Sequence, residues 1–263
     1  MTGSVGAFTN ALGHRIHYET RGAGPALVLV HGWGSDARGN WLSTGWVDAL
    51  CDLRRIVLLD VRGHGLSDKP LDPACYGYAD MAQDVLGLLD HLRIERADYL
   101  GYSMGAFMGA WLLGHAGGRF RSMILGGVGI ETPASIAAVD AVAAALRTAD
   151  AAAVTDPVGR AVRAFVDADP AIDAVAREAL AVSALRMWPE GDAVALGGAG
   201  LAAVARPVLL VVGSEDRPYV DTVDRVAAAI PGARTVRLPG CDHLSAVRAP
   251  AFRAAVRELL TAP

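Results

Sequence analysis

Five short, continuous apolar runs constrain the fold of this 263-residue chain more than any other feature of its sequence. An unbroken run of Val, Leu and Ile is typical of a strand that is buried on both faces, as in a parallel sheet covered by helices. The runs are ALVLVHG (Ala26–Gly32), RRIVLLD (Arg54–Asp60), ADYLGYS (Ala97–Ser103), SMILGGV (Ser122–Val128) and PVLLVVG (Pro207–Gly213). The alternating stretch Arg15–Thr20 predicts an edge strand, and Ala233–Gly240 predicts a weaker last strand.

Helical patterns separate these runs. In Tyr78–Leu92 the apolar residues recur at helical spacing, and Met104–Gly117, Tyr219–Ile230 and Pro250–Leu260 are similar. Strands that alternate with helices predict right-handed crossovers and a parallel sheet. The sequence therefore predicts an α/β fold.

One long segment, residues 131–203, contains no buried-strand pattern. It holds alanine-rich helical stretches that are interrupted by Pro133, Pro157, Pro170 and Pro189. We expect three or four helices that form a cap, inserted between two strands of the sheet. The predicted division is a core of residues 1–130 and 204–263 and a helical cap of residues 131–203.

Composition narrows the function classes. A hydrophobic fraction of 52%, with 20% charged residues, excludes a disordered chain. The net charge of −4 comes without a cluster of Lys and Arg, which argues against binding to nucleic acid or to an anionic membrane. The apolar runs are too short to span a membrane, so we expect a cytoplasmic protein. Three widely spaced cysteines without a C-x-x-C pair favour neither disulfides nor a zinc site, and we expect no metal or cofactor.

Ser103 stands between two glycines, in the sequence Gly101-Tyr102-Ser103-Met104-Gly105, where a predicted strand meets a predicted helix. Ligands bind at this carboxyl edge of an open α/β sheet. A sharp turn that lifts a serine hydroxyl above the sheet needs small neighbours, and the glycines provide them. The other interpretation is a helix N-cap followed by a closely packed glycine. The strand–turn–helix context favours a nucleophile.

A serine needs a base, and the base needs an acid to orient it. Glu215 and Asp216 follow a later strand, and His243 lies in the loop after the last strand. The order serine, acid, histidine, each at the carboxyl end of a strand, is the order that such a fold uses. We predict Ser103, Asp216 and His243 as the catalytic residues. Asp216 is preferred to Glu215 because it lies deeper in its loop, and Asp242 is interpreted as a turn residue.

An acyl-transfer site also needs donors for the oxyanion. The backbone N–H of Trp33 follows the first buried strand, and that of Met104 begins the helix after Ser103. We predict these two groups as the oxyanion hole. His31 is expected to pack locally, because the donor is a backbone group.

Several motifs together resemble the α/β-hydrolase superfamily, over nearly the whole chain. They are HGWG (His31–Gly34), DVRGHGLSD (Asp60–Asp68), GYSMG (Gly101–Gly105), GSEDRP (Gly213–Pro218) and GCDHLSA (Gly240–Ala246). The resemblance implies a mostly parallel eight-stranded sheet flanked by helices, with a small helical cap between the sixth and seventh strands. It also implies that the loop DVRGHGLSD is structural, with its arginine and aspartate bracing it beside the site. We therefore expect a local hydrogen-bonded role for Arg62 and His64, outside the catalytic residues. The forms HGWG and GYSMG resemble small carboxylesterases, enol-lactonases and cofactor-free haloperoxidase-like members.

The serine at position 103 argues against haloalkane dehalogenases and epoxide hydrolases, which carry an aspartate there. We predict a serine hydrolase that cleaves a small to medium, mainly apolar carboxylic ester through an acyl-enzyme on Ser103. Hydrolysis of a lactone or enol-lactone, or of a C–C bond, is the alternative within the fold, and a non-catalytic small-molecule receptor is the alternative outside enzymes. The partner is then a small-molecule ester or lactone, and a homo-oligomer is left open.

The pocket is expected under the cap. Its predicted walls are Trp33, Tyr102, Met104 and Leu244 from the core, and Phe165, Met187 and Trp188 from the cap. The cap sequence lacks a cluster of charges that would recognise a carboxylate or phosphate, although Arg186 could do so singly. Neutral, mainly apolar esters are therefore favoured.

Overall fold

The computed structural model describes residues 3–262, except the side chain of Ala195. Its centre is a single eight-stranded sheet with the order β1-β2-β4-β3-β5-β6-β7-β8. The strands are β1 (Gly3–Thr9), β2 (Arg15–Arg21), β3 (Ala26–Val30), β4 (Arg55–Leu59), β5 (Ala97–Tyr102), β6 (Phe120–Gly126), β7 (Val208–Gly213) and β8 (Arg234–Leu238). Only β2 pairs antiparallel with its neighbours on both sides, and the pairs from β4 to β8 are all parallel. The predicted mostly parallel α/β fold is confirmed.

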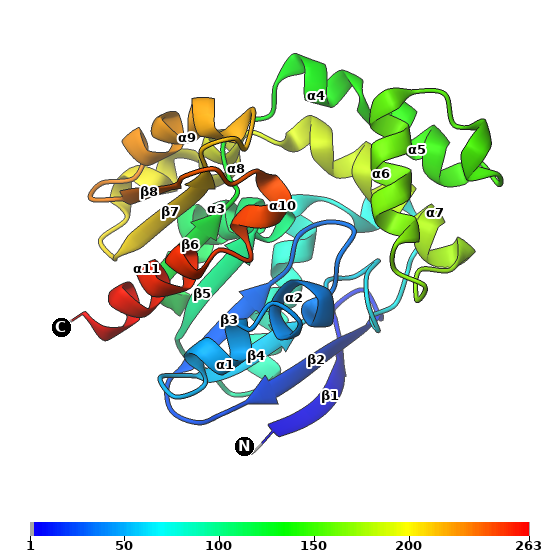
Figure 1. The fold of residues 1–263 in the computed structure, drawn as a ribbon. Coiled ribbons are helices and arrows are strands. Elements are labelled where there is room, and N and C mark those ends of the chain that lie inside the picture. Colours follow the sequence, from blue (N-terminus) through cyan, green and yellow to red (C-terminus); the bar gives the residue numbers. More distant parts are fainter. Residues whose placement is uncertain (1–2, 263) are drawn as a thin grey trace.

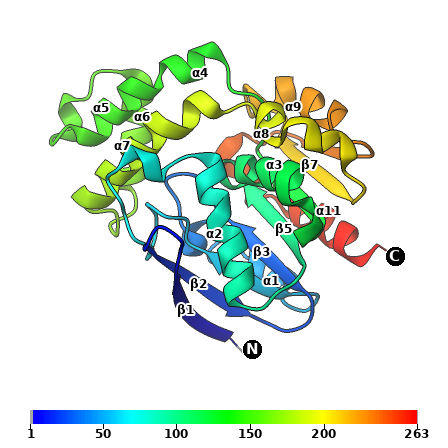
Figure 2. The same ribbon diagram turned by 180° about the vertical axis from the view of Figure 1, so that it is seen from behind.

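Alternation along the buried strands divides the core into two layers. Leu27 and Leu29 of β3 face one side of the sheet, with α1 (Trp46–Leu50) and α11 (Pro250–Thr261). Val28 and Val30 face the other side, covered by α2 (Tyr78–His91), α3 (Met104–Ala116) and α9 (Tyr219–Ala228). Figure 1 shows the first layer in front of the sheet, and Figure 2 shows the second. Burial on both faces explains why these strands are continuously apolar.

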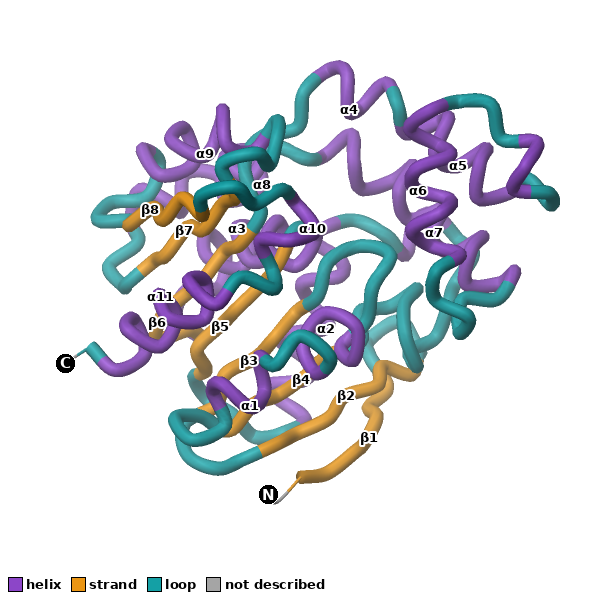
Figure 3. Tube along the Cα trace, in the orientation of Figure 1, coloured by secondary structure: helices purple, strands orange, loops and turns teal. Residues whose placement is uncertain are grey.

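Further helices join β6 to β7. They are α4 (Pro133–Ala137), α5 (Val139–Arg147), α6 (Pro157–Asp167), α7 (Ala174–Met187) and α8 (Ala193–Gly197). Side chains cap α4, α6 and α7 at Thr132, Asp156 and Asp173, so each start has a local sequence cause. Helices α5, α6 and α7 share a small apolar core of their own. Figure 3 shows α4 to α7 grouped at one side, apart from the orange strands.

Helix α8 lies away from that group. A Cβ added at Gly114 of α3 would overlap the carbonyl of Gly197 at the end of α8, so the two helices touch backbone to backbone. Ala193 of α8 belongs to the sheet-facing core. The segment that joins β6 to β7 thus returns to the core before β7 begins. The division into a core and a cap of residues 131–203 stays a prediction.

Among residues 3–262, no helix has both the length and the apolar character that a membrane crossing requires.

Candidate active site

Ser103 occupies a strained corner between β5 and α3. Its backbone has φ 50° and ψ −115°, which is a rare conformation for a residue with a side chain. The Ser103 N–H donates to the carbonyl of Gly126 (2.8 Å), which fixes the turn against β6. A Cβ at Gly101 would overlap the carbonyl of Gly105, and one at Gly105 would overlap the carbonyl of Val30. Both glycines are therefore required for the turn, as the sequence predicts.

His243 and Asp216 meet at this corner from two later loops. Nδ1 of His243 lies 3.0 Å from both carboxylate oxygens of Asp216, and Asp216 is buried. His243 begins the short helix α10 (His243–Ala246), which is capped by the side chain of Asp242. Tyr102 donates its hydroxyl proton to the carbonyl of His243 (2.6 Å), and this hydrogen bond fixes the backbone of the loop that carries His243.

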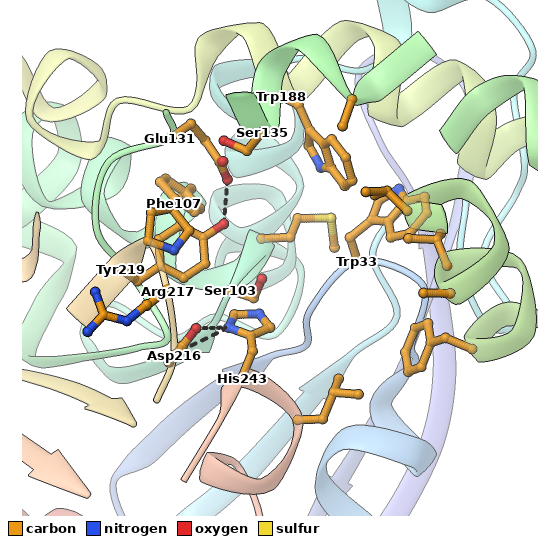
Figure 4. Close-up of a pocket in the computed structure, with 18 of the residues that line it drawn as sticks. Trp33, Ser103, Phe107, Glu131, Ser135, Trp188, Asp216, Arg217, Tyr219 and His243 are labelled. Atoms are coloured by element: carbon orange, nitrogen blue, oxygen red, sulfur yellow. Dashed lines mark hydrogen bonds and ion pairs between the residues drawn. The ribbon is translucent and has the colours of Figure 1, made fainter. Parts of the chain in front are cut away.

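The structure brings the Ser103 hydroxyl beside the His243 ring (Figure 4). Within residues 3–262, no hydrogen bond joins the Ser103 Oγ to that ring. Such contacts are often long in unliganded enzymes and tighten when substrate binds. Because Nδ1 is engaged by Asp216, Nε2 is the ring atom available to the hydroxyl. Glu215, the other acid of this loop, is exposed and has no contact with His243 among the described residues.

Two backbone donors lie next to Ser103. Throughout the described part of the chain, the N–H groups of Trp33 and Met104 have no hydrogen-bond acceptor. The loop that carries Trp33 is fixed, because the Gly32 N–H donates to Asn40 Oδ1 (3.1 Å). The Trp33 indole Nε1–H donates to Ser183 Oγ on α7 (3.0 Å), which ties this loop to the helices above it. Free N–H groups on a fixed loop and at a helix N-terminus can stabilise a negative oxygen.

His31 braces this loop and is not available for chemistry. Its Nδ1–H donates to the Gly32 carbonyl (2.8 Å), and its Nε2 accepts from the Val61 N–H (3.0 Å), so both ring nitrogens are used. Burial lowers the pKa of His31. The centroid of the His64 ring lies 5.2 Å from that of His31, and burial lowers the pKa of His64 to about 3. Both histidines are therefore neutral, and both have the local role that the sequence predicts.

The loop that follows β4 is held by two buried carboxylates. Asp60 accepts from the Ala37 N–H (2.9 Å) and contacts Nδ1 of His17 (3.0 Å). Burial alone would raise the pKa of Asp60, but these hydrogen bonds and the nearby His31 lower it to about 2. Arg62 forms a two-fold ion pair with Asp84, at 2.7 Å for each contact, and both side chains are buried. The resemblance implied this bracing role for Arg62.

A cavity of about 430 Å³ opens from Ser103 towards α4, α6 and Trp188. Most of its lining is apolar. It is lined by Trp33, Tyr78, Ser103, Met104, Phe107, Glu131, Ser135, Ala138, Val158, Ala161, Val162, Phe165, Trp188, Asp216, Arg217, Pro218, Tyr219, His243 and Leu244. We call it the cap cavity; Figure 4 shows it from the side of His243.

Three sequence predictions about the pocket need correction. Met187 is fully buried in the sheet-facing core and does not line the cap cavity, because α7 turns this side chain towards the sheet. Tyr102 lies beneath His243 and faces another hollow. Arg186 forms an ion pair with Glu190 and is absent from the cavity lining. Helical spacing alone could not distinguish a side chain that faces the core from one that faces a cavity.

The second hollow is an open cleft of about 730 Å³ on the other side of the serine. It shares Trp33, Ser103, Phe165, His243 and Leu244 with the cap cavity. Its other walls carry more polar side chains than those of the cap cavity, and they come from the loop after β3, the α6–α7 connection and α10. They include Ser35, Asn40, Ser43, Thr44, Asp169, Asp242, Ser245 and Arg248. Ser103 thus stands between the cap cavity and a cleft with more polar side chains in its walls.

Sequence reasoning missed two residues that line the cap cavity, Tyr219 and Glu131. The Tyr219 hydroxyl donates to Glu131 Oε1, and its ring packs against the ring of His243, with centroids 5.3 Å apart. Burial and the Glu131 carboxylate raise the pKa of Tyr219 well above its usual value. Among the described residues, no cluster of His, Cys, Asp and Glu is arranged to hold a metal ion.

Comparison with known proteins agrees with this architecture. The family model described as the alpha/beta hydrolase fold matches residues 25–151. The crystal structure of a hydrolase from Pseudomonas aeruginosa PA01 is similar over 98% of this chain and 99% of that chain, with 31% identity and a TM-score of 0.80.

Curated relatives match a shorter part of the chain. A 3-oxoadipate enol-lactonase of Acinetobacter baylyi is 36% identical over 42% of this chain and 40% of its own length. The dihydrolipoyllysine-residue acetyltransferase component of an acetoin cleaving system of Pseudomonas putida is 41% identical over 39% of this chain and 26% of its own length. The matches therefore span less than half the length of these two relatives.

Proposed function

Because this chain belongs to the α/β-hydrolase family, we propose that it is a serine hydrolase that cleaves carboxylic esters through an acyl-enzyme on Ser103. The observation that carries the proposal is the meeting of the Ser103 hydroxyl, the His243 ring and the Asp216 carboxylate at one corner of the sheet. Each group comes from the carboxyl end of a different strand. The strained backbone at Ser103 is a further sign of function, because strain of this kind persists where a site needs it.

The mechanism has two steps. Nε2 of His243 takes the Ser103 proton as Oγ attacks the ester carbonyl, and the N–H groups of Trp33 and Met104 stabilise the oxyanion. The C–O bond to the alcohol then breaks, and His243 returns the proton to the leaving oxygen. A water that gives its proton to His243 attacks the acyl-enzyme, and the acid leaves as Ser103 regains its proton. Asp216 holds the Nδ1–H tautomer and stabilises the charged ring.

The two hollows suggest how an ester would bind. We assign the acyl part to the cap cavity, whose lining is mainly apolar and whose volume of about 430 Å³ suits a small to medium group. The alcohol part would then lie in the second cleft, which has more polar side chains in its walls. Mainly apolar acyl groups are the substrate class that this arrangement favours.

Lactones are a second substrate class, since their hydrolysis uses the same acyl-enzyme, and a relative is named as an enol-lactonase. C–C bond hydrolysis is less favoured, because the described lining of the cap cavity offers no unpaired cation for an acidic substrate: Arg217 pairs with Asp221 at 2.6 Å. A receptor without catalysis would not need two free N–H groups beside a strained serine. A cytoplasmic location completes the proposal, and fluorescence of a tagged chain would test it. Light scattering would distinguish a monomer from a homo-oligomer, the state that the sequence leaves open.

The test is turnover of p-nitrophenyl acetate, butyrate and hexanoate, with lactones in parallel, by the purified full chain. Ser103→Ala should abolish turnover while the melting temperature changes by only a few degrees. A fluorophosphonate probe should label the unaltered protein at Ser103, as mass spectrometry of its peptides would show. An active Ser103→Ala variant would refute the nucleophile. Binding of an ester without turnover or labelling would favour the receptor.

A further inference from the structure

Glu131 is the acidic residue of the cap cavity that the proposed mechanism does not use. Its backbone is fixed from two sides: the Glu131 N–H donates to the Gly191 carbonyl (2.8 Å), and the preceding Ile130 N–H donates to Thr222 Oγ1 (2.9 Å). A Cβ at Gly191 would overlap Glu131 Cγ, so the neighbouring chain also confines the side chain. The position of the carboxylate is therefore set by the fold.

The carboxylate faces the cavity with one oxygen engaged. Oε1 accepts from the Tyr219 hydroxyl, whose ring packs on His243. In Figure 4, Glu131 lies beyond the Tyr219 hydroxyl, on the side of that ring away from His243. Within residues 3–262, Oε2 has no hydrogen-bond partner and the carboxylate has no ion pair. An acceptor is thus left for a ligand in a largely apolar space.

The charges that line the cavity leave this carboxylate unbalanced. Asp216 is hydrogen-bonded to the His243 ring, and Arg217, the sole arginine or lysine of the described lining, is mostly exposed and paired with Asp221. Arg186, the cap arginine that the sequence suggested for binding an anion, is paired with Glu190 outside the cavity. A substrate group that carries a negative charge would meet Glu131 without a compensating cation.

We propose that Glu131 is a specificity-determining residue, which selects substrates whose cavity-bound part carries a hydrogen-bond donor, such as an ammonium or hydroxyl group, and rejects those that carry a carboxylate there. A donor group would bond to the free Oε2, and a charged donor would gain most, because charge-assisted hydrogen bonds are stronger than neutral ones. The inference deepens the proposed ester hydrolysis and relies on it for the acyl assignment. It separates this chain from hydrolases of acidic lactones and dienoates.

A binding experiment tests this without catalysis. Hexylammonium, hexanol and hexanoate have the same chain and differ in the charge of one end, and Trp33 and Trp188 in the cavity wall would report their binding by fluorescence. We expect hexylammonium to bind about tenfold more tightly than hexanoate. Glu131→Gln keeps the size and the acceptor for Tyr219 but removes the charge, and should bring the ratio to within about threefold. The control is Glu178→Gln on α7. Glu178 pairs with Arg147 outside the cavity, so this substitution should leave the tenfold ratio unchanged.

Kinetics extend the test to the reaction. The p-nitrophenyl ester of 6-aminohexanoate and the p-nitrophenyl mono-ester of adipate have matched chain lengths. In the unaltered protein, kcat/KM should be higher for the amino ester. In Glu131→Gln, kcat/KM should be similar for the two esters. Equal binding of hexanoate and hexylammonium, no saturable binding of hexylammonium, or an unchanged ratio in Glu131→Gln would overturn the inference. Failure of the proposed function would differ, because the binding preference would persist while no ester was cleaved.

Discussion

Asp216 can influence Ser103 only through the ring of His243. Its carboxylate is buried and touches Nδ1, whereas the hydroxyl lies beside the opposite edge of the ring. In the proposed mechanism, the carboxylate therefore fixes which nitrogen carries the proton at rest. Without that preference, the ring would present a proton to Ser103 in place of a lone pair.

Replacement of Asp216 by Asn should lower kcat for p-nitrophenyl butyrate by about 10³- to 10⁴-fold near neutral pH, because the amide would donate to Nδ1 and stabilise the wrong tautomer. The matched control is Glu215→Gln in the adjacent position, which should lower kcat by less than about threefold, since Glu215 is exposed and has no contact with the ring in the described structure. Steady-state kinetics of both variants would check this. An equal loss in both would mean that the acid is wrongly assigned.

At this scale, the sequence places the residues that follow the ends of strands, and most of the predicted cavity walls do line the cap cavity: Trp33, Met104, Phe165, Trp188 and Leu244. It does not predict which other side chains meet there. Ser103, Asp216 and His243 could be predicted because a strand pattern precedes each of them. Glu131 and Tyr219 are 88 residues apart, and nothing in the neighbourhood of either indicates that they meet. Their contact exists only because β6 and β7 are neighbours in the sheet.

The strand–turn–helix unit of β5 and α3 is the element on which the site depends. Its helix begins so close to β3 that the second helical residue, Gly105, has no room for a side chain. The helix N-terminus then points its free N–H groups at the position above Ser103. The close packing of Gly105 against β3 therefore also sets where the N–H groups of this helix N-terminus point.

Gly105→Ala should destabilise the fold by at least about 2 kcal/mol, because the new methyl group would overlap the Val30 carbonyl and neither β3 nor α3 can move freely. Gly118→Ala is the matched control: it lies in open space at the end of the same helical region, and should change stability by less than about 1 kcal/mol. Urea denaturation would give both values. If Gly105→Ala does not accumulate as folded protein, a large drop in soluble yield relative to Gly118→Ala supports the same conclusion, and equal stability contradicts it.

The elements that the sequence predicts best are those buried on both faces. Strand β1 had no apolar run to reveal it, because Phe8 is its single buried residue and the rest of the strand lies at the exposed edge. Its position depends on antiparallel pairing with β2, which is a long-range property. Helix α8 shows the same limit, since its contact with α3 is made by glycine backbones that carry no periodic signal.

For the whole molecule, buried titratable groups predict a loss of stability in acid. The pKa of His64 is lowered to about 3 from an ordinary value of 6.5, so between these values the unfolded chain binds a proton that the folded chain does not. The pKa of Asp60 is lowered to about 2 from 3.8, which has the same sign at lower pH. The contribution of these groups to the free energy of unfolding is therefore complete above pH 6.5. It falls as the pH falls, by about 1.4 kcal/mol per pH unit for each group between its folded-state and unfolded-state pKa values.

Urea denaturation at pH 8, 6, 5 and 4 would check this slope. In His64→Asn, whose amide can replace the Nδ1–H donor to the Arg62 carbonyl, we expect a smaller slope between pH 6 and 4. His31, whose pKa burial also lowers, would keep part of the slope. Identical slopes in both proteins would show that His64 does not control acid stability.

The placement of Ser103 between the cap cavity and the second cleft would have a consequence for the proposed catalytic cycle. In that mechanism the alcohol leaves first, because it is the leaving group of acylation, while the acyl half stays covalently attached in the cap cavity. The part of the cleft that the alcohol vacates would then be the route by which water arrives. A second alcohol that entered by the same route would compete with that water, so we expect transesterification to accompany hydrolysis when alcohol is added.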